Sequence, residues 1–273
     1  MRRVKLTIAY DGTAYRGFQL QPGEATIQSV MEEALGRLLQ ERVRLRPAGR
    51  TDAGVHALRQ VVDFLDGGRR DLATIVRGGN ALLPTDIRIL SAEEVLPSFD
   101  ARRHAKAKEY RYFLLLHPVA SPFRFRYAWH LGRPLDADAM REGLKPLLGE
   151  HDFSAFRGQG CTARTTVRTI LRAELESRSP AHCVVSITGS GFLRHMVRSI
   201  VGTLVEAGTG KIPPERVSSI LASGDRGMAG PTAPPQGLFL WQVSYGEDPF
   251  SLDAGRDVGC NIFFDFEGEG LHR

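Results

Sequence analysis

The 273-residue chain has few cysteines, and their spacing does not suit a metal site. Cys161, Cys183 and Cys260 are far apart in the sequence, and none belongs to a CxxC pair. Structural zinc sites need closely spaced cysteine and histidine ligands, and disulfide-rich domains need more cysteines than this. The sequence therefore argues against a zinc ribbon, and because free cysteines are typical of a reducing compartment we expect a cytoplasmic location.

Long apolar segments and targeting signals are also missing. The apolar runs are far shorter than the roughly 20 residues that cross a bilayer as a helix. Met1 to Lys5 lead directly into a strand pattern, without the apolar core or cleavage site of a signal peptide. We therefore expect no membrane partner.

Motifs for nucleotide, metal-dependent and serine-hydrolase chemistry are absent as well. Residues 208–211 (Gly-Thr-Gly-Lys) resemble part of a phosphate-binding loop, but Ile212 replaces its Ser or Thr and Val205 its first glycine. The eight histidines show no HExxH spacing, and no serine lies in a GxSxG motif. The sequence thus predicts no cofactor and no metal, and His56 and His195 are interpreted as structural or RNA-facing residues.

What the sequence has in excess is positive charge, and most of it is arginine, at 31 of 36 basic residues. Residues 246–273 carry 2 basic and 7 acidic side chains, which leaves 34 basic against 24 acidic side chains in residues 1–245. Arginine binds phosphate bidentately and stacks on bases, which favours a nucleic-acid partner. A genome-wide preference for arginine codons would explain the same composition, so composition alone leaves both interpretations open.

The clustering of charge favours the nucleic-acid interpretation. Basic residues are dense in residues 101–130, whose only acidic residue is Glu109. The basic residues of this stretch are Arg102, Arg103, Lys106, Lys108, Arg111, Arg124 and Arg126, and the aromatic residues are Tyr110, Tyr112, Phe113, Phe123, Phe125, Tyr127 and Trp129. An RNA backbone with unstacked bases needs this combination, so we predict an RNA-binding surface here.

The hydrophobic pattern predicts an α+β fold with two units of similar order. In residues 1–100 it predicts strand 4–10, helix 27–39, strands 43–48 and 59–65, helix 72–80 and strand 86–90. In residues 101–245 it predicts strands 108–116 and 127–131, helix 136–148, strands 166–176 and 182–189, helix 192–207, a helix after Pro213 and strand 238–245. Two ferredoxin-like halves with mainly antiparallel sheets would flank a central basic cleft. Residues 246–273 are interpreted as an acidic appendage.

A polar loop at residues 49–57 carries the best candidate carboxylate, Asp52. Gly49 and Gly54 permit backbone angles that other residues avoid, and apolar, alternating segments on both sides indicate that the loop joins two strands. An aspartate in a turn is most often inert, so this loop alone does not establish any chemistry.

A predicted helix supplies the loop with a possible partner. Arg194 and Arg198 lie four residues apart in the predicted helix 192–207 and would share one face. A guanidinium within ~4–6 Å would hold Asp52 ionised, as a nucleophile or a base requires.

At these residues the chain resembles the pseudouridine synthases of the tRNA pseudouridine synthase A type. Seven motifs of that family occur in order between about residues 4 and 245. They are residues 10–19 (YDGTAYRGFQ), 49–56 (GRTDAGVH), 80–87 (NALLPTDI), 110–112 (YRY), 152–157 (DFSAFR), 196–202 (MVRSIVG) and 237–240 (GLFL).

The resemblance implies a pseudouridine synthase fold and a cofactor-free isomerase. Such an enzyme breaks the glycosidic bond of a uridine in tRNA, rotates the base and rejoins it through C5. The family's targets are positions 38, 39 and 40 of the anticodon stem-loop, and its members are homodimers. The partners implied are therefore tRNA and a second copy of the chain.

The resemblance also implies roles for individual residues. Asp52 is the nucleophile, attacking either C6 of the base or C1′ of the sugar, and Arg198 pairs with it. Tyr110 stacks on the target uracil and is a candidate proton acceptor. Arg50 helps to flip the base, and Leu238 lines the pocket.

Beside these roles, Arg157, Arg164 and Arg168 are predicted to hold the RNA backbone. Two other functions are alternatives to the isomerase. One is a non-catalytic tRNA-binding or tRNA-folding module on the same scaffold, in which Asp52 would be dispensable. The other is a hydrolase that stops after the glycosidic bond is broken and releases free uracil.

Overall fold

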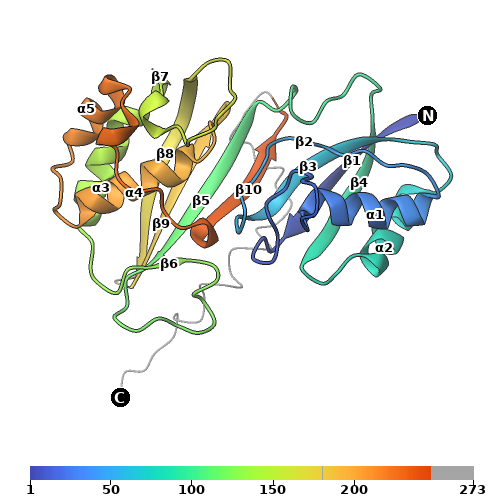
Figure 1. Ribbon diagram of the computed structural model, residues 1–273, viewed down its shortest axis with the longest axis horizontal. Helices are drawn as coiled ribbons and strands as arrows, with labels where there is room; N and C mark the ends of the chain where they lie inside the picture. Colours follow the sequence, from blue (N-terminus) through green and yellow to red (C-terminus); the bar gives the residue numbers. More distant parts are fainter. Residues whose placement is uncertain (180, 247–273) are drawn as a thin grey trace.

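The computed structural model describes residues 1–179 and 181–246. This part of the chain forms one large, mostly antiparallel sheet with helices beside it (Figure 1). The strands are β1 (Arg2–Tyr10), β2 (Arg46–Pro47), β3 (His56–Asp66), β4 (Ile87–Val95), β5 (Ala107–Leu115), β6 (Trp129–His130), β7 (Gly149–Asp152), β8 (Val167–Ser179), β9 (His182–Gly189) and β10 (Leu238–Ser244). The helices are α1 (Ile27–Leu39), α2 (Leu72–Leu82), α3 (Ala137–Leu144), α4 (Met196–Gly208) and α5 (Arg216–Ser223), with short 3₁₀ turns η1 (Lys145–Leu147), η2 (Ser154–Phe156), η3 (Arg226–Met228) and η4 (Pro235–Gly237).

The sheet order is β4-β1-β3-β10-β5-β9-β8-β7, with β2 paired to β3 and β6 paired to β5. In Figure 1, α1 and α2 lie beside the N-terminal strands, and α3, α4 and α5 lie beside the C-terminal strands. The predicted α+β class with mainly antiparallel pairing is therefore confirmed.

The last strand, β10, lies in the middle of the sheet, between β3 and β5. It pairs in parallel with β3, where Phe239 lies opposite His56, and antiparallel with β5, where Leu240 lies opposite Tyr110. Because β3 directly follows the loop that carries Asp52, this pairing places that loop next to the middle of β5.

Local sequence signals account for several elements. Thr26 caps α1 by accepting a hydrogen bond from the backbone N–H of Ser29, and the Ser29 hydroxyl accepts from the N–H of Thr26. Asp71 caps α2 in the same way through the N–H of Thr74. Val4, Leu6 and Ile8 alternate with more exposed residues along β1 and are fully buried, as the strand pattern predicts.

The predicted strand 43–48 is wrong over most of its length, because only Arg46 and Pro47 pair with β3. Its apolar residues are buried as predicted, but the backbone of Leu45 bonds to side chains of α1. The N–H of Leu45 donates to Glu32 Oε1 at 2.9 Å, and its carbonyl accepts from Gln28 Nε2 at 3.3 Å. Side-chain partners thus replace the ladder hydrogen bonds that define a strand.

The boundaries of three helices differ from prediction. Helix α2 passes through Gly79, a close-packing position against Ile89, and ends at Leu82, because the residue before Pro84 avoids helical angles. Helix α3 ends at Leu144 rather than near 148, since Pro146 cannot donate the next helical hydrogen bond. Helix α4 begins at Met196 rather than Phe192, for a reason that bears on the site.

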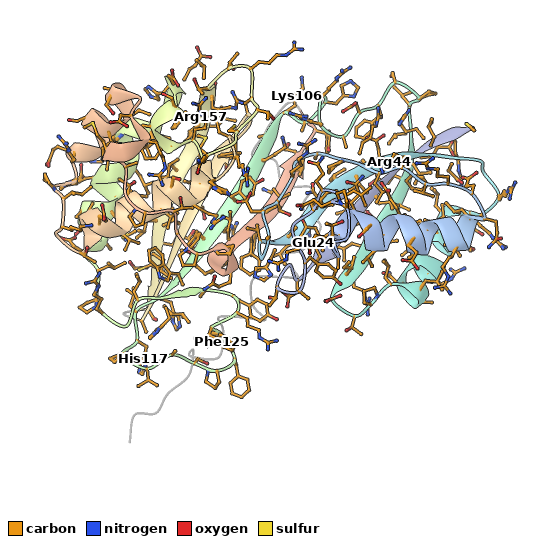
Figure 2. The ribbon with its side chains drawn as sticks, viewed as in Figure 1. Glu24, Arg44, Lys106, His117, Phe125 and Arg157 are labelled. Atoms are coloured by element: carbon orange, nitrogen blue, oxygen red, sulfur yellow. The ribbon has the colours of Figure 1, made fainter. Side chains whose placement is uncertain are left out.

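The basic and aromatic stretch 101–130 does not form one surface. Tyr110, Tyr112 and Phe113 are buried, because β5 is a central strand covered on both faces. Figure 2 labels Lys106, before β5, at the upper edge of the molecule and Phe125, after β5, at the lower edge. The predicted continuous RNA-binding strip is therefore divided between opposite ends of the sheet.

Residues 247–273, nearly all of the predicted acidic appendage, lie outside the described residues. In the part of the chain that the structure describes, none of the helices combines the length and the apolar character that crossing a bilayer requires.

Candidate active site

The loop that carries Asp52 is held by three hydrogen bonds, to β1, to β3 and to the segment between β1 and α1. Gln60 Nε2 donates to the carbonyl of Gly49 at 2.7 Å, and the N–H of Phe18 donates to the carbonyl of Thr51 at 3.1 Å. The buried hydroxyls of Tyr10 and Thr51 lie 2.8 Å apart. Burial raises the pKa of Tyr10 to about 12, so this phenol is neutral near pH 7. These bonds fix the backbone directly before Asp52.

Two glycines allow a neighbouring segment to contact this loop directly. A Cβ on Gly12 would lie 2.0 Å from the carbonyl oxygen of Val55, so no side chain fits there. Gly17 has φ +88°, and its Cβ would lie 2.8 Å from the carbonyl oxygen of Thr51. The family motif at residues 10–19 therefore packs directly against the backbone of the Asp52 loop.

Asp52 forms an ion pair with Arg198, as the resemblance implied. Arg198 Nη1 donates to Asp52 Oδ2 at 3.0 Å across 146 residues of sequence. The other side of the guanidinium is fixed, because Arg198 Nε donates to the carbonyl of Ala233 at 2.7 Å. The Asp52 side chain keeps 26% of its surface exposed and that of Arg198 13%, so the carboxylate is anchored yet reachable from solvent.

The helix that carries Arg198 starts later than predicted because His195 adopts the left-handed conformation, with φ 61°. Arg194 consequently lies outside the helix and is exposed, and its carbonyl accepts a hydrogen bond from the N–H of Gly158 at 2.8 Å. The expectation that Arg194 and Arg198 share a helix face is therefore wrong.

The same backbone turn brings the His195 side chain close to Asp52, which its sequence position did not predict. His195 Nε2 lies 3.6 Å from Asp52 Oδ2. The imidazole packs against Gly158, where a Cβ would lie 2.6 Å from His195 Nδ1. Burial lowers the pKa of His195, the charge of Asp52 opposes this, and Arg198 and other nearby arginines reinforce it. The only sequence signal for this residue was its place three positions before Arg198.

Tyr110 and Leu238 lie on one face of the sheet, since Leu240 pairs with Tyr110 and Leu238 pairs with Tyr112. The edge of the Phe192 ring contacts Tyr110, with ring centroids 5.0 Å apart. Burial raises the pKa of the Tyr110 phenol, and the negative charge of Asp52 raises it further. Tyr110 is therefore a neutral, rigidly packed ring whose hydroxyl lies near the Asp52 loop, 3.8 Å from where a Cβ of Gly49 would be.

The other predicted contacts lie around this centre without touching it. Arg50 is exposed and adjoins Asp52 in the loop. Arg157 is exposed just before Gly158, the glycine against which His195 packs, and Figure 2 labels it at the upper edge of the molecule. Arg164 is exposed in the segment that leads into β8. These three side chains are available to a ligand that covers the site.

His56, by contrast, has a structural environment. Its ring is buried and stacks on Phe239 with centroids 4.6 Å apart. Its Nδ1 lies 3.1 Å from Asp11 Oδ1, and its Nε2 lies 3.1 Å from the carbonyl of Arg126. Among residues 1–179 and 181–246, no group of three or more His, Cys, Asp or Glu residues is arranged to hold a metal ion.

Comparison with known proteins agrees with this geometry. A family model described as tRNA pseudouridine synthase matches residues 6–102 and 144–246. The tRNA pseudouridine synthase A of Pelobacter propionicus is 49% identical over 245 residues, which are 90% of this chain and 100% of that protein. The chain belongs to the tRNA pseudouridine synthase family.

A second relative of the same family, tRNA pseudouridine synthase A of Myxococcus xanthus, is 47% identical over 93% of this chain and 96% of its own. Among solved structures, the archaeal box H/ACA sRNP Nop10–Cbf5 complex covers 74% of this chain and 44% of that chain, with 13% identity and a TM-score of 0.34. That likeness is too distant to add to the assignment. The non-catalytic alternative finds no support among these relatives, because both are named as synthases.

Other motif residues of this tRNA pseudouridine synthase family member support the site indirectly. A Cβ on Gly202 would lie 1.7 Å from the carbonyl oxygen of Pro231, so this glycine lets the segment that contacts Arg198 approach α4. A Cβ on Gly237 would lie 2.6 Å from the ring of Tyr112. These two glycines therefore serve close packing beside the ion pair rather than chemistry.

The pKa of His195 predicts a pH dependence of stability. Because that pKa is lowered from 6.5, the folded chain binds fewer protons at His195 than the unfolded chain between the lowered pKa and 6.5. The free energy of unfolding should fall as pH drops through this window. We expect His195→Gln to lose less stability than the wild type between pH 7.5 and 5.5, measured by urea unfolding.

His117→Gln, a matched loss of an imidazole at the exposed lower edge in Figure 2, is the control. Parallel stability–pH curves for the wild type and His195→Gln would show that burial and the surrounding arginines do not disfavour the charged imidazole.

Proposed function

We propose that the chain, a tRNA pseudouridine synthase by family, isomerises uridine at positions 38, 39 and 40 of the anticodon stem-loop with Asp52 as its nucleophile. The observation that carries the proposal is the 3.0 Å hydrogen bond from Arg198 Nη1 to Oδ2 of Asp52, the aspartate of the family's loop motif. A carboxylate held in one orientation by a fixed guanidinium and still 26% exposed has the orientation and access that a nucleophile needs.

The reaction breaks the N1–C1′ bond of uridine and forms a C5–C1′ bond. C5 loses its proton and N1 gains one, so the product has the same atoms as the substrate and no electrons are transferred. Asp52 attacks either C1′, from which C5 of the rotated base then displaces it, or C6, from which it leaves once the C5–C1′ bond has formed and C5 has lost its proton. The balance of the reaction requires neither a redox cofactor nor a nucleotide.

Tyr110 would receive the flipped uracil. Removing a base from its stack costs a few kcal/mol, and stacking on an aromatic ring offsets about 1–3 kcal/mol of this cost. Since burial raises the pKa of Tyr110, the phenolate is disfavoured as a base. The hydroxyl can accept the C5 proton only while it passes its own proton on. Leu238, on the same sheet face, would line the apolar side of the pocket.

The exposed arginines would hold the RNA. Arg50 would enter the stem as the base leaves it, and Arg157 and Arg164 would contact backbone phosphates. The two ferredoxin-like halves, residues 1–100 and 101–245, would flank a central basic cleft that receives the anticodon arm.

We further propose a homodimer that acts in the cytoplasm, for which light scattering should give twice the mass of the chain.

Chemical mapping of pseudouridine tests this function. Bulk tRNA incubated with the protein is treated with carbodiimide and copied by primer extension, and we expect stops confined to positions 38, 39 and 40. Stops elsewhere in tRNA would assign another target site to the same chemistry. Free uracil in the reaction, measured by chromatography, would instead indicate the hydrolase.

A further inference from the structure

Lys108 lies next to the Asp52 loop and has no role in the chemistry proposed above. It precedes Tyr110 by two residues on β5, so both side chains leave the same face of the sheet. The Cδ and Cε atoms of Lys108 lie 3.6 Å from where a Cβ of Gly49 would be, and the Tyr110 hydroxyl lies 3.8 Å from the same point. The missing side chain at Gly49 thus allows the lysine and the tyrosine to approach one part of the loop.

The charged groups of the described chain that act on Lys108 are cations. Arg102, from the segment before β5, and Arg168, from β8, both act on its charge. Its partners in the sheet, Gly189 on β9 and Val243 on β10, carry no charge. Burial, with the two arginines acting in the same direction, lowers the pKa of Lys108 to about 8.

The environment of Lys108 differs from that of the other described lysines in burial and in ion pairing. Lys5 pairs with Glu93 at 2.9 Å, Lys145 pairs with Glu142 at 2.6 Å, and Lys211 pairs with Glu206. Lys106 is exposed to solvent. Within residues 1–179 and 181–246, Lys108 alone among the lysines is partly buried without a carboxylate in ion-pair distance.

Arg168 gives the cluster a fixed geometry. Its Nη1 donates to the carbonyl and hydroxyl of Thr165 and to the carbonyl of Val167, all of which are neutral acceptors. These bonds orient the guanidinium without neutralising it. Among the residues that the structure describes, a site with three cations and no carboxylate therefore lies beside the loop that holds the nucleophile.

We propose that Lys108, Arg102 and Arg168 form a subsite for one backbone phosphate of the RNA, next to the uridine that Asp52 attacks. This inference rests on the proposed function and assigns Lys108 as a positioning residue. A phosphodiester carries one negative charge and several acceptor oxygens, which matches one ammonium and two forked guanidiniums. Fixing this phosphate would hold the sugar of the flipped nucleotide in register with Asp52.

Salt dependence of binding tests the proposal. Lys108→Met, Lys108→Arg and the control Lys145→Met are made in the Asp52→Asn background, so that no turnover occurs during equilibrium binding. The affinity of each variant for tRNA is measured by fluorescence anisotropy at salt concentrations between about 50 and 200 mM. Loss of one phosphate contact should weaken binding about 5- to 10-fold and lower the slope of log K against log salt by about 0.7–0.9 in Lys108→Met. Lys108→Arg and Lys145→Met should keep the reference slope.

A pH series separates a phosphate contact from a packing defect. Because phosphate binds the protonated lysine, affinity should fall as pH rises through about 8 in the reference protein. Lys108→Arg should remove this fall, since an arginine stays charged. Tyr110, Arg102, Arg168 and Cys161 remain intact in that variant, so their ionisation cannot account for the difference.

An unchanged salt slope in folded Lys108→Met, or an unchanged pH dependence in Lys108→Arg, would overturn the phosphate subsite. Failure of the proposed function is distinguishable, because it would appear as missing pseudouridine in the mapping of wild-type reactions. Thermal unfolding of each variant verifies that the binding changes come from folded protein.

Discussion

Asp52→Asn is expected to lower the rate of tritium release from tRNA labelled at C5 of uridine by at least about 10⁴-fold, because removal of an enzyme's nucleophile commonly costs this much or more. An asparagine amide occupies nearly the same volume and still accepts a hydrogen bond from Arg198, but its oxygen is a poor nucleophile. The folded structure and the contacts with RNA should therefore persist.

Two measurements accompany the rate. The affinity of Asp52→Asn for tRNA should stay within about threefold of the wild type, since Asp52 itself contributes no attraction to phosphate. Asp86→Asn, at a carboxylate that accepts a hydrogen bond from the Tyr15 hydroxyl at 2.7 Å, is the matched control for the chemical change. Turnover at the wild-type rate in Asp52→Asn would refute the assignment of the nucleophile.

Arg198→Met is expected to have the second largest effect, a decrease of about 10²–10³-fold in the single-turnover rate. The guanidinium orients the carboxylate through Nη1 and is itself fixed through Nε to the carbonyl of Ala233. Removing one member of a partly buried ion pair leaves the other without its partner, which costs several kcal/mol when the pair is buried and less where solvent reaches it.

The variant Arg198→Lys separates the effect of the planar guanidinium geometry from the effect of the positive charge. The ammonium keeps the positive charge but cannot bond Ala233 and Asp52 from one planar group, so we expect its rate to lie between those of the wild type and Arg198→Met. Arg141→Met, which removes an arginine paired with the exposed Asp138 on α3, should leave the rate unchanged. Equal rates for wild type and Arg198→Met under single-turnover conditions would contradict the proposed orientation of Asp52.

Local sequence signals predicted those elements in which propensity, capping and burial agree. Helix α1 has a capping residue at Thr26 and one apolar face, and its bounds were predicted correctly. Strand β10 was predicted to within one residue at its end. Prediction failed at residues 43–48, where the side chains of Glu32 and Gln28 take the backbone hydrogen bonds, because a sequence pattern reports burial and not the identity of the partner.

In the site, too, local sequence signals predicted some features and tertiary contacts decided others. The loop motif and the arginine of the 196–202 motif were recognisable as residue types, and their pairing followed from the resemblance. The start of α4 was not predicted, since a histidine with φ 61° is held there by tertiary contacts that include the close approach of Gly158. This single residue decides both that Arg194 lies outside the helix and that an imidazole lies 3.6 Å from Asp52.

By itself, the sequence determined the family, the α+β class and the identity of Asp52, Tyr110 and Arg198 as the residues to examine. These follow from short motifs and from burial periodicity, which depend on neighbours close in the chain. Only the tertiary structure decided what surrounds them, because contacts between residues as far apart as 146 positions set the orientation of Asp52. Within the described part of the chain, the same long-range packing left Lys108 near arginines and without a carboxylate partner, a property that no local pattern of charges contains.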